Sequence, residues 1–261
     1  MIQLLLGCII LGIGFFIFYV FPIHKDSRNL VLGALFAIIA LVLKRFSVML
    51  PLFAVPAIKI SFESLALFIA GVILPPSYAY IVALVVDLIG LIITPTQFPF
   101  LGFTLSTVLS TSLPSVMYTS MKQWGEKKLQ TCLWALCIIS ISLTSMYVLT
   151  LHTVKINSLM ITMNIWSKVI IISFCIFLAL MLGFIILHMK RKRVSLPLFY
   201  TWVCIVIVSQ LTISFLLNPY WLQVMYGIPY SLSLFVRVIK ECIMIPLTII
   251  IGYQIIKVLK R

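Results

Sequence analysis

The chain has 261 residues, of which 63% are hydrophobic and only 9% are charged, and its mean hydropathy is +1.25. A soluble domain is excluded, because a soluble fold needs a polar face on most of its elements and long stretches of this chain have none. The net charge of +14 comes from 19 Lys and Arg against 5 Asp and Glu, and the basic residues cluster at the ends of apolar runs. This clustering is typical of a membrane protein and argues against nucleic-acid binding.

Apolar runs long enough to cross about 30 Å of hydrocarbon follow one another along the chain. We expect an all-α, polytopic transmembrane helix bundle that forms a single membrane domain. Nine spans are predicted, at residues 1–22, 29–43, 63–75, 77–95, 103–119, 130–151, 158–188, 196–217 and 228–257. The first lacks a basic n-region and a small-residue cleavage site, so we expect a retained helix rather than a signal peptide. The third is short enough to be a tilted or partial span.

The basic residues predict the orientation, because cytoplasmic segments of membrane proteins carry an excess of Lys and Arg. With the N-terminus outside, the inner segments hold 12 basic residues and the outer segments hold 4. The inner ones are Lys25, Arg28, Lys122, Lys127, Lys128, Lys190, Arg191, Lys192, Arg193, Lys257, Lys260 and Arg261; the outer ones are Lys44, Arg45, Lys59 and Lys155. We therefore expect a multi-pass protein of the cell membrane with its N-terminus outside and its C-terminus in the cytoplasm.

Asp87, Arg237, Lys240 and Glu241 lie well inside predicted spans. A charge at bilayer depth costs at least about 2.5–3.5 kcal/mol on insertion scales, so such residues are candidates for a functional site. The last three have i, i+3, i+4 spacing and share one helical face, on which Arg237 can pair with Glu241.

Two interpretations of these charges stay open from the residues alone. Arg237 suits a bidentate contact with a carboxylate that arrives from outside. It equally suits an ion pair with Asp87 that only holds the bundle together. Asp87 can accept hydrogen bonds from a ligand, or it can neutralise Lys240.

Two predicted outer connections, Thr94–Gly102 and Asn218–Gly227, carry no charge and are rich in aromatic residues, Pro and Gly. This composition is typical of an interfacial aromatic belt with turns. It also suits a lid over an outward-facing pocket for a flat aromatic ligand. Gly102 permits a tight turn, and Thr104 or Ser106 can cap the helix that follows. The N-terminus of this helix is either simply capped or binds an anionic ligand.

Small residues Gly33, Ala34 and Ala37 gather on one face of the span at 29–43. This face serves either ordinary packing inside the bundle or the docking of a partner membrane subunit.

Catalytic motifs, a nucleotide-binding P-loop and metal-binding spacings are all missing from the sequence. The 6 cysteines lie in apolar runs without a CxxC pair, as buried packing residues do. We expect a protein that is not an enzyme, that uses no cofactor or metal, and that cannot itself couple ATP hydrolysis to transport.

At these positions the chain resembles the folate-specific S component of energy-coupling factor (ECF) transporters. One matching region contains Arg45-Phe46, Lys59-Ile60-Ser61-Phe62, Ala70-Gly71, Asp87-Leu88-Ile89-Gly90, Pro95 and Gly102-Phe103-Thr104-Leu105-Ser106. The other contains Asn218-Pro219-Tyr220-Trp221-Leu222, Tyr226-Gly227, Arg237-Val238-Ile239-Lys240 and Pro246. Together the two regions cover roughly 120 of the 261 residues, in the order that the family has.

The resemblance implies a six-helix, substrate-binding membrane subunit that takes folate from outside and docks on a transmembrane coupling protein carrying two ATPase subunits. It implies a core at 29–119 and 196–261, with 1–22 as an added helix and 130–188 as an inserted helix pair. It implies a docking role for Gly33, Ala34 and Ala37. The implied ligand contacts are Asp87, Gly102, Phe103, Thr104, Asn218, Trp221, Tyr226, Arg237 and Lys240: the flat pterin stacks on the aromatic rings, and Arg237 or Lys240 meets the glutamate carboxylates.

The chain departs from the family pattern at three places. Pro219 stands where a small hydroxyl residue is usual, Ser64 stands where a Pro is usual, and Phe100-Leu101 separates Pro99 from Gly102. These departures keep an S component for a different vitamin or a nucleobase-like ligand open. A structural or sensory membrane protein, whose charges only fix the bundle, is the alternative of another class. A membrane enzyme would need Asp87, Arg237 and Lys240 to be catalytic without a suitable His or second carboxylate.

Overall fold

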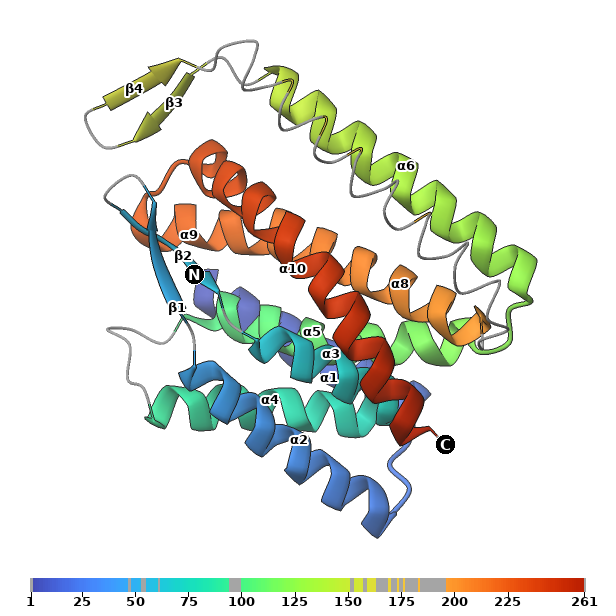
Figure 1. Cartoon of the computed structure of the whole chain (residues 1–261). Coiled ribbons are helices and arrows are strands. Elements are labelled where there is room, and N and C mark those ends of the chain that lie inside the picture. The colour runs from blue at the N-terminus through green and yellow to red at the C-terminus, as the bar shows by residue number, and fades with distance from the viewer. Residues whose placement is uncertain are drawn as a thin grey trace.

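A computed structural model shows the chain as a bundle of helices (Figure 1). The structure describes residues 2–46, 48–52, 55–60, 62–93, 100–150, 153–156, 159–162, 169, 173, 176, 183 and 196–260. The helices are α1 (Ile2–Val20), α2 (Ser27–Arg45), α3 (Glu63–Ile73), α4 (Pro76–Ile93), α5 (Leu101–Met121), α6 (Glu126–Thr150), α8 (Leu196–Gln210), the π-helix η1 (Leu211–Leu217), α9 (Asn218–Tyr226) and α10 (Tyr230–Leu259).

Five helical stretches in the described part of the chain are long and apolar enough to cross a membrane. They are α1, α2, α4, α6 and the continuous stretch Pro197–Tyr226, which joins α8, η1 and α9. A sixth is added if α10 counts as one span, because its two parts meet at an angle of 51° between Val238 and Ile243. The predicted polytopic helix bundle is therefore confirmed, and α3 is the short helix expected at 63–75, with 11 residues.

Two short β-hairpins were not predicted. Strand β1 (Val48–Leu52) pairs antiparallel with β2 (Val55–Ile60), and β3 (Thr153–Ile156) pairs antiparallel with β4 (Leu159–Thr162). These segments are rich in Val, Ile and Thr, which favour strands, and only two residues separate the strands of each pair, as in tight hairpins. The predicted span at 158–188 is thus wrong at its start, where β4 lies. Most of its remainder lies outside the described residues.

Helix α5 lies at the centre of the bundle, in contact with α1, α3, α4, α8 and α9. It is not among the five apolar stretches, because it carries many Ser and Thr residues. Several of its hydroxyls bond to the backbone one turn earlier: Ser110 donates to the carbonyl of Ser106 at 2.8 Å, and Thr119 donates to that of Ser115 at 2.8 Å. Such bonds let a polar helix lie inside a membrane bundle.

Helices α3 and α5 approach each other closely at Gly71. A side chain at this position would collide with the backbone oxygen of Thr111 and would lie 2.9 Å from Cβ of Pro114. Close by, the Ser115 hydroxyl donates to the carbonyl of Leu74 at 2.7 Å. Small residues that permit backbone contact are typical of helix interfaces in membranes.

The N-terminal helix α1 packs against α4 and α5. The Tyr80 hydroxyl donates to the carbonyl of Ile10 at 3.0 Å, and Gly14 leaves the room for that ring, since a Cβ there would lie 2.6 Å from the hydroxyl oxygen. The helix expected as an addition at 1–22 is therefore bound to the bundle by a buried hydrogen bond. Helix α6, from the region 130–188, packs on α8 along one edge of the bundle (Figure 1).

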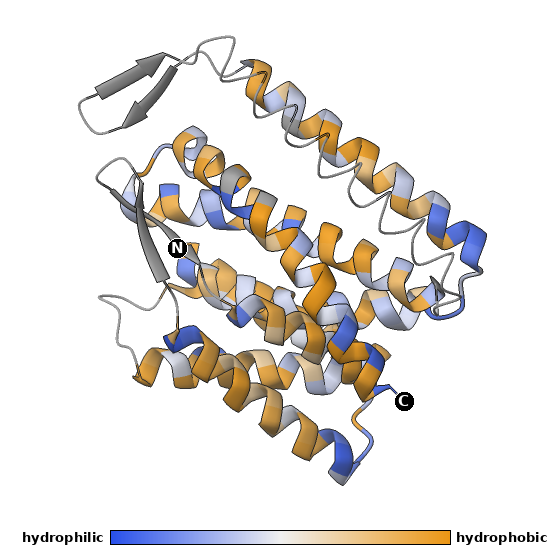
Figure 2. Ribbon diagram, viewed as in Figure 1, coloured by the Kyte–Doolittle hydropathy of each residue, from blue (hydrophilic) through white to orange (hydrophobic). Residues whose placement is uncertain are grey.

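Most charged residues lie near the ends of the helices, and the stretches between them are mainly apolar (Figure 2). The starts of α2 and α6 and the end of α10 lie at one end of the bundle (Figure 1). The basic residues of that end are Lys25, Arg28, Lys122, Lys127, Lys128, Lys257 and Lys260. We call it the basic end; the other end holds the hairpin β1–β2, the start of α5 and helix α9 (Figure 1).

We predict that Gly71→Ala lowers the free energy of unfolding by about 1–3 kcal/mol, because the added methyl group overpacks the contact between α3 and α5. The matched control is Gly12→Ala on α1, where nothing lies within 4 Å of the new Cβ. Thermal unfolding of the detergent-purified proteins compares the two. Equal melting temperatures for both variants would contradict the close contact at Gly71.

Candidate functional site

The candidate site lies at the end of the bundle opposite the basic end, around the first turns of α5. Two neighbouring residues of α5 face different helices there. Ser106 accepts a hydrogen bond from Trp221 Nε1 of α9 at 3.2 Å, and the Thr107 hydroxyl lies 3.3 Å from Asp87 Oδ1 of α4. The start of α5 therefore links an aromatic group on one side to a charged group on the other.

The charged group, which we call the Asp87 cluster, consists of Lys44, Glu63, Asp87 and Thr107. Lys44 Nζ lies 3.3 Å from Glu63 Oε1 and 3.9 Å from Asp87 Oδ1. The lysine side chain passes directly over Gly90, where a Cβ would lie only 2.8 Å from its Nζ. Three helices, α2, α3 and α4, thus contribute one cation and two carboxylates to a single network.

Asp87 is 5% exposed, so its charge needs a partner inside the protein. The structure provides Lys44, and it corrects the two partners considered from the sequence, Lys240 and Arg237. Sequence reasoning placed Lys44 in an outer connection. Instead α2 continues to Arg45, which carries Lys44 into the bundle alongside the end of α4.

A second group, the Glu241 cluster, consists of Ser214, Arg237, Lys240 and Glu241. The Ser214 hydroxyl donates to Glu241 Oε1 at 2.5 Å, and Lys240 Nζ lies 3.6 Å from the same oxygen. Arg237 Nη1 donates to the Ser214 hydroxyl at 3.5 Å. The expected ion pair between Arg237 and Glu241 is therefore replaced by one between Lys240 and Glu241, with Ser214 standing between the arginine and the carboxylate.

The backbone around the Glu241 cluster is irregular on both sides. Ser214 belongs to the π-helix η1, and Lys240 and Glu241 lie where α10 bends by 51°. Glu241 is 1% exposed, and its Oε2 has no hydrogen-bond partner among the described residues. π-helical turns and broken membrane helices are frequent at binding sites, because they present polar groups inside the bilayer.

The aromatic cluster consists of Phe100, Phe103, Tyr220 and Trp221. The Phe100 ring is edge-to-face with Phe103 at a centroid distance of 5.9 Å and packs at 65° against Trp221 at 5.7 Å. Tyr220 packs on the outer side of Trp221 at 5.1 Å. Gly102 lets Trp221 approach α5, since a Cβ there would lie 2.7 Å from the indole ring. Both predicted connections therefore contribute rings to one cluster, although residues 94–99 lie outside the described part of the chain.

The second connection is a helix rather than a loop. Residues Asn218–Tyr226 form α9, which continues η1 and ends at Gly227 in the left-handed conformation, with φ of 66°. Pro219 lies in the first turn of α9, at the junction with η1; it donates no backbone hydrogen bond, and the carbonyl of Phe215 four residues earlier accepts one from the Tyr230 hydroxyl at 2.9 Å. Pro and aromatic residues in this segment predict a turn, but the chain instead continues as a helix from α8 through η1.

The expected cap of α5 is also wrong. The helix begins after Phe100, which makes no side-chain capping bond. Ser106 instead donates to the carbonyl of Gly102 at 3.2 Å, and Thr104 is buried within the helix. Both residues lie too far inside the helix to reach its free amides, so their hydroxyls turn toward the interior of the bundle.

The remaining predicted contacts occupy different environments. Asn218 is half-buried where η1 meets α9, and Tyr226 is 56% exposed at the end of α9. On α2, Gly33 and Ala37 are buried, with Gly33 against Val82 of α4, whereas Ala34 is exposed. Two of the three small residues thus pack inside the bundle, which is the first of the two interpretations considered for this face.

Neither a scan against protein-family models nor a search of curated proteins finds a match to this chain. In the described part of the chain, no group of three or more His, Cys, Asp or Glu side chains is placed to hold a metal ion. The geometry of the three clusters is therefore the basis on which a function is assigned.

We predict that Lys44→Met lowers the free energy of unfolding by about 3 kcal/mol, because it leaves the buried Asp87 carboxylate without a cation. Asp87→Asn alone should cost less, since Lys44 keeps Glu63. The loss of unfolding free energy in the double variant should be smaller than the sum of the two single losses, by about 1 kcal/mol or more. A double-mutant cycle from thermal or denaturant unfolding measures this coupling; additive effects would show that the ion pair is absent in solution.

Proposed function

We propose that this chain is the substrate-binding membrane subunit of an ECF-type vitamin uptake transporter, with folate as its ligand. Separate subunits, a transmembrane coupling protein and two ATPases, supply the energy. The observation that carries the proposal is the link that Ser106 and Thr107 make between an aromatic cluster and a charged network at one end of the bundle. A pterin needs both kinds of contact, because its flat ring stacks on aromatic side chains and its ring N–H and amino groups can donate to a carboxylate such as Asp87.

The aromatic cluster suggests how a pterin ring is held. Trp221 is 5% exposed, so a ligand stacks on it only if a neighbouring ring moves. Phe100 contacts both Phe103 and Trp221 and immediately precedes the first turn of α5. We propose that the pterin takes the place of Phe100, between Phe103 and Trp221, and that the Phe100 ring moves out of the site.

The Glu241 cluster supplies the groups for the anionic part of the ligand. Arg237 lies within 4 Å of no carboxylate oxygen that the structure describes; its one described hydrogen bond is to the neutral hydroxyl of Ser214, and the Glu241 carboxylate interacts with it only over a longer distance. A guanidinium has five donors in a planar fork that matches a carboxylate. Arg237 is therefore the residue with which the glutamate tail of folate would pair, and Lys240 stays with Glu241.

The arrangement of charges supports an outward-facing site. The basic end carries most of the described Lys and Arg residues and would lie in the cytoplasm, where basic segments are enriched. The candidate site would then open to the outside, and the basic end would face the ATPase subunits. This orientation places the N-terminus outside and the C-terminus inside.

The first test is thermal stabilisation of the detergent-purified protein by folic acid, 5-formyltetrahydrofolate, thiamin, riboflavin and biotin. A ligand at 1,000 times its Kd should stabilise the folded state by about 4 kcal/mol. Stabilisation by folates alone is expected. Stabilisation by another vitamin would support the role as a transporter subunit but show that its ligand is not folate. A well-folded protein that none of these compounds stabilises would favour the structural or sensory role.

Substitutions in the aromatic cluster test the proposed position of the ring. Trp221→Ala should abolish folate binding. Phe100→Ala should bind folate at least about twofold tighter, because the ligand no longer displaces a ring pair worth about 0.5–1.5 kcal/mol. Phe15→Ala, at a residue of α1 that is 76% exposed, is the control for loss of an aromatic side chain. Weaker binding by Phe100→Ala would contradict the displacement and make Phe100 itself a stacking partner.

Arg237→Gln tests the contact with the carboxylate. It should lower the affinity for folic acid more than the affinity for pteroic acid, which lacks the glutamate tail. Arg28→Gln, at the basic end, removes the same charge far from the site and should bind both compounds normally. Equal loss for both compounds would show that Arg237 supports the fold of the site and does not contact the tail. Melting curves without ligand identify any variant that fails to fold.

A further inference from the structure

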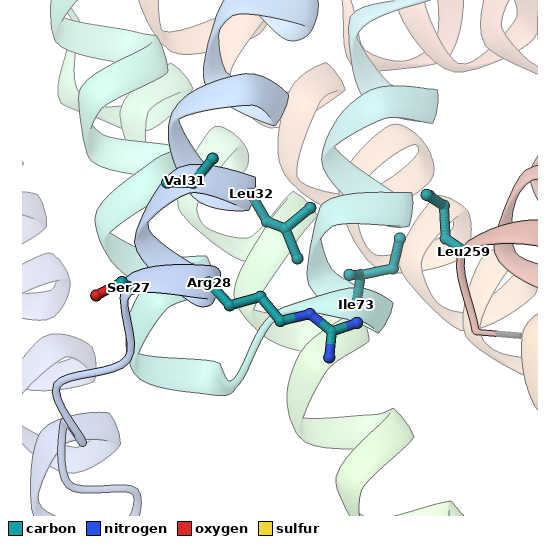
Figure 3. A pocket seen from close by; sticks show the side chains of 6 residues that line it. All are labelled: Ser27, Arg28, Val31, Leu32, Ile73 and Leu259. Atoms are coloured by element: carbon teal, nitrogen blue, oxygen red, sulfur yellow. The ribbon is translucent and has the colours of Figure 1, made fainter.

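An open cavity of about 440 Å³ lies between the start of α2 and the ends of α3 and α10 (Figure 3). Its walls are mainly aliphatic and come from Val31, Leu32, Ile73 and Leu259. The polar lining residues are Ser27 and Arg28, both at the start of α2. The cavity therefore combines an apolar interior with one cationic side chain, and it lies at the basic end, on parts of α2, α3 and α10 that are away from the candidate site.

The Arg28 side chain extends from α2 across the cavity toward Ile73, and the Ser27 side chain points away from it (Figure 3). The only contact described for Arg28 is its backbone amide, which donates to Asp26 at 3.0 Å as part of the helix cap. Its guanidinium forms no ion pair with any carboxylate of the described residues. An arginine in this state has all of its side-chain donors available for an anion.

The surroundings of the cavity add further basic side chains, and the acid beside Arg28 is Asp26, which caps α2. Lys260 follows the lining residue Leu259, and its Nζ lies 3.1 Å from the centroid of the Tyr118 ring. Burial and the nearby charge of Lys122 lower the pKa of the Lys260 ammonium to about 7. A negatively charged group bound near Leu259 would favour the protonated form of Lys260, and it would find the Arg28 guanidinium without an ion-pair partner among the described residues.

The cavity also borders the surface that faces the membrane. Val31 is 62% exposed, and the neighbouring α2 residues Leu30 and Leu35 are 64% and 48% exposed. An aliphatic chain can therefore pass from the bilayer into the cavity without crossing polar surface. Arg28, at the end of the span, lies at the depth where lipid headgroups are expected.

We propose that this cavity binds an anionic phospholipid, with one acyl chain between Leu32, Ile73 and Leu259 and the phosphate on Arg28. Basic pockets between helices on the cytoplasmic side are suited to such headgroups. A neutral, zwitterionic phospholipid offers the same acyl chain and phosphate but carries a compensating cation, which the basic surroundings disfavour. Lipid binding in this cavity does not require that the protein transports a vitamin or that its ligand is folate.

Native mass spectrometry of the purified full chain, titrated with phosphatidylglycerol or phosphatidylcholine, tests the proposal. One phosphatidylglycerol should bind at least about fivefold more tightly than phosphatidylcholine. Arg28→Gln should lower phosphatidylglycerol binding about fivefold, as expected for one basic residue worth about 1 kcal/mol at a membrane surface. Lys127→Gln, which removes an exposed charge from α6 at the same end, should leave it unchanged.

A second pair of variants tests the cavity itself. Val31→Trp fills it and should weaken binding of both phospholipids, whereas Leu30→Trp adds the same ring next to it and should not. Equal binding of the two phospholipids, or equal effects of Arg28→Gln and Lys127→Gln, would overturn the role of Arg28. Unchanged binding by a folded Val31→Trp variant would overturn the placement of the acyl chain.

Discussion

The structure depends on one constraint: a polar group inside a membrane bundle must find its partner within the protein. Helix α5 carries six of the twelve buried Ser and Thr residues that the structure describes, and other helices surround it. Most of its Ser and Thr hydroxyls bond to their own backbone or to a neighbouring element, as Ser115 does to Leu74, whereas Thr111 Oγ1 has no partner among the described residues. The helix that is least suited to face lipid thus fixes the positions of α1, α3, α4, α8 and α9 around it.

The same constraint explains why the Glu241 cluster lies at irregular backbone. A regular helix satisfies its own backbone and leaves charged side chains to find partners at fixed spacing. The π-helix η1 shifts Ser214 relative to the preceding helix, and the bend in α10 brings Glu241 against it. The two distortions therefore provide a polar partner for a buried carboxylate, with one oxygen, Oε2, lacking a partner among the described residues.

The positions of the helices could be predicted from the sequence, but the pairing of charged side chains between helices could not. Hydropathy depends on composition along one segment, so eight of the nine predicted spans coincide with described helices. A pairing depends on which helices become neighbours, and helical periodicity does not contain that information. Asp87 was therefore assigned the wrong ion-pair partners. Lys44 was missed because the predicted span ends at residue 43, whereas α2 continues to Arg45. The convergence of Phe103 with Trp221 was expected from the resemblance, whereas the ring of Phe100 between them was not.

Helix α10 connects the two ends of the molecule. Its first part carries Arg237 toward the candidate site, and its last residue, Leu259, lines the cavity at the basic end. From Glu241 to Leu259 the helix is roughly 27 Å long at 1.5 Å per residue. A change of about 5° in its bend would move Leu259 by about 2 Å, because a helix of this length acts as a lever. The bend next to Glu241 therefore sets both the position of the Glu241 cluster and the position of Leu259 at the cavity.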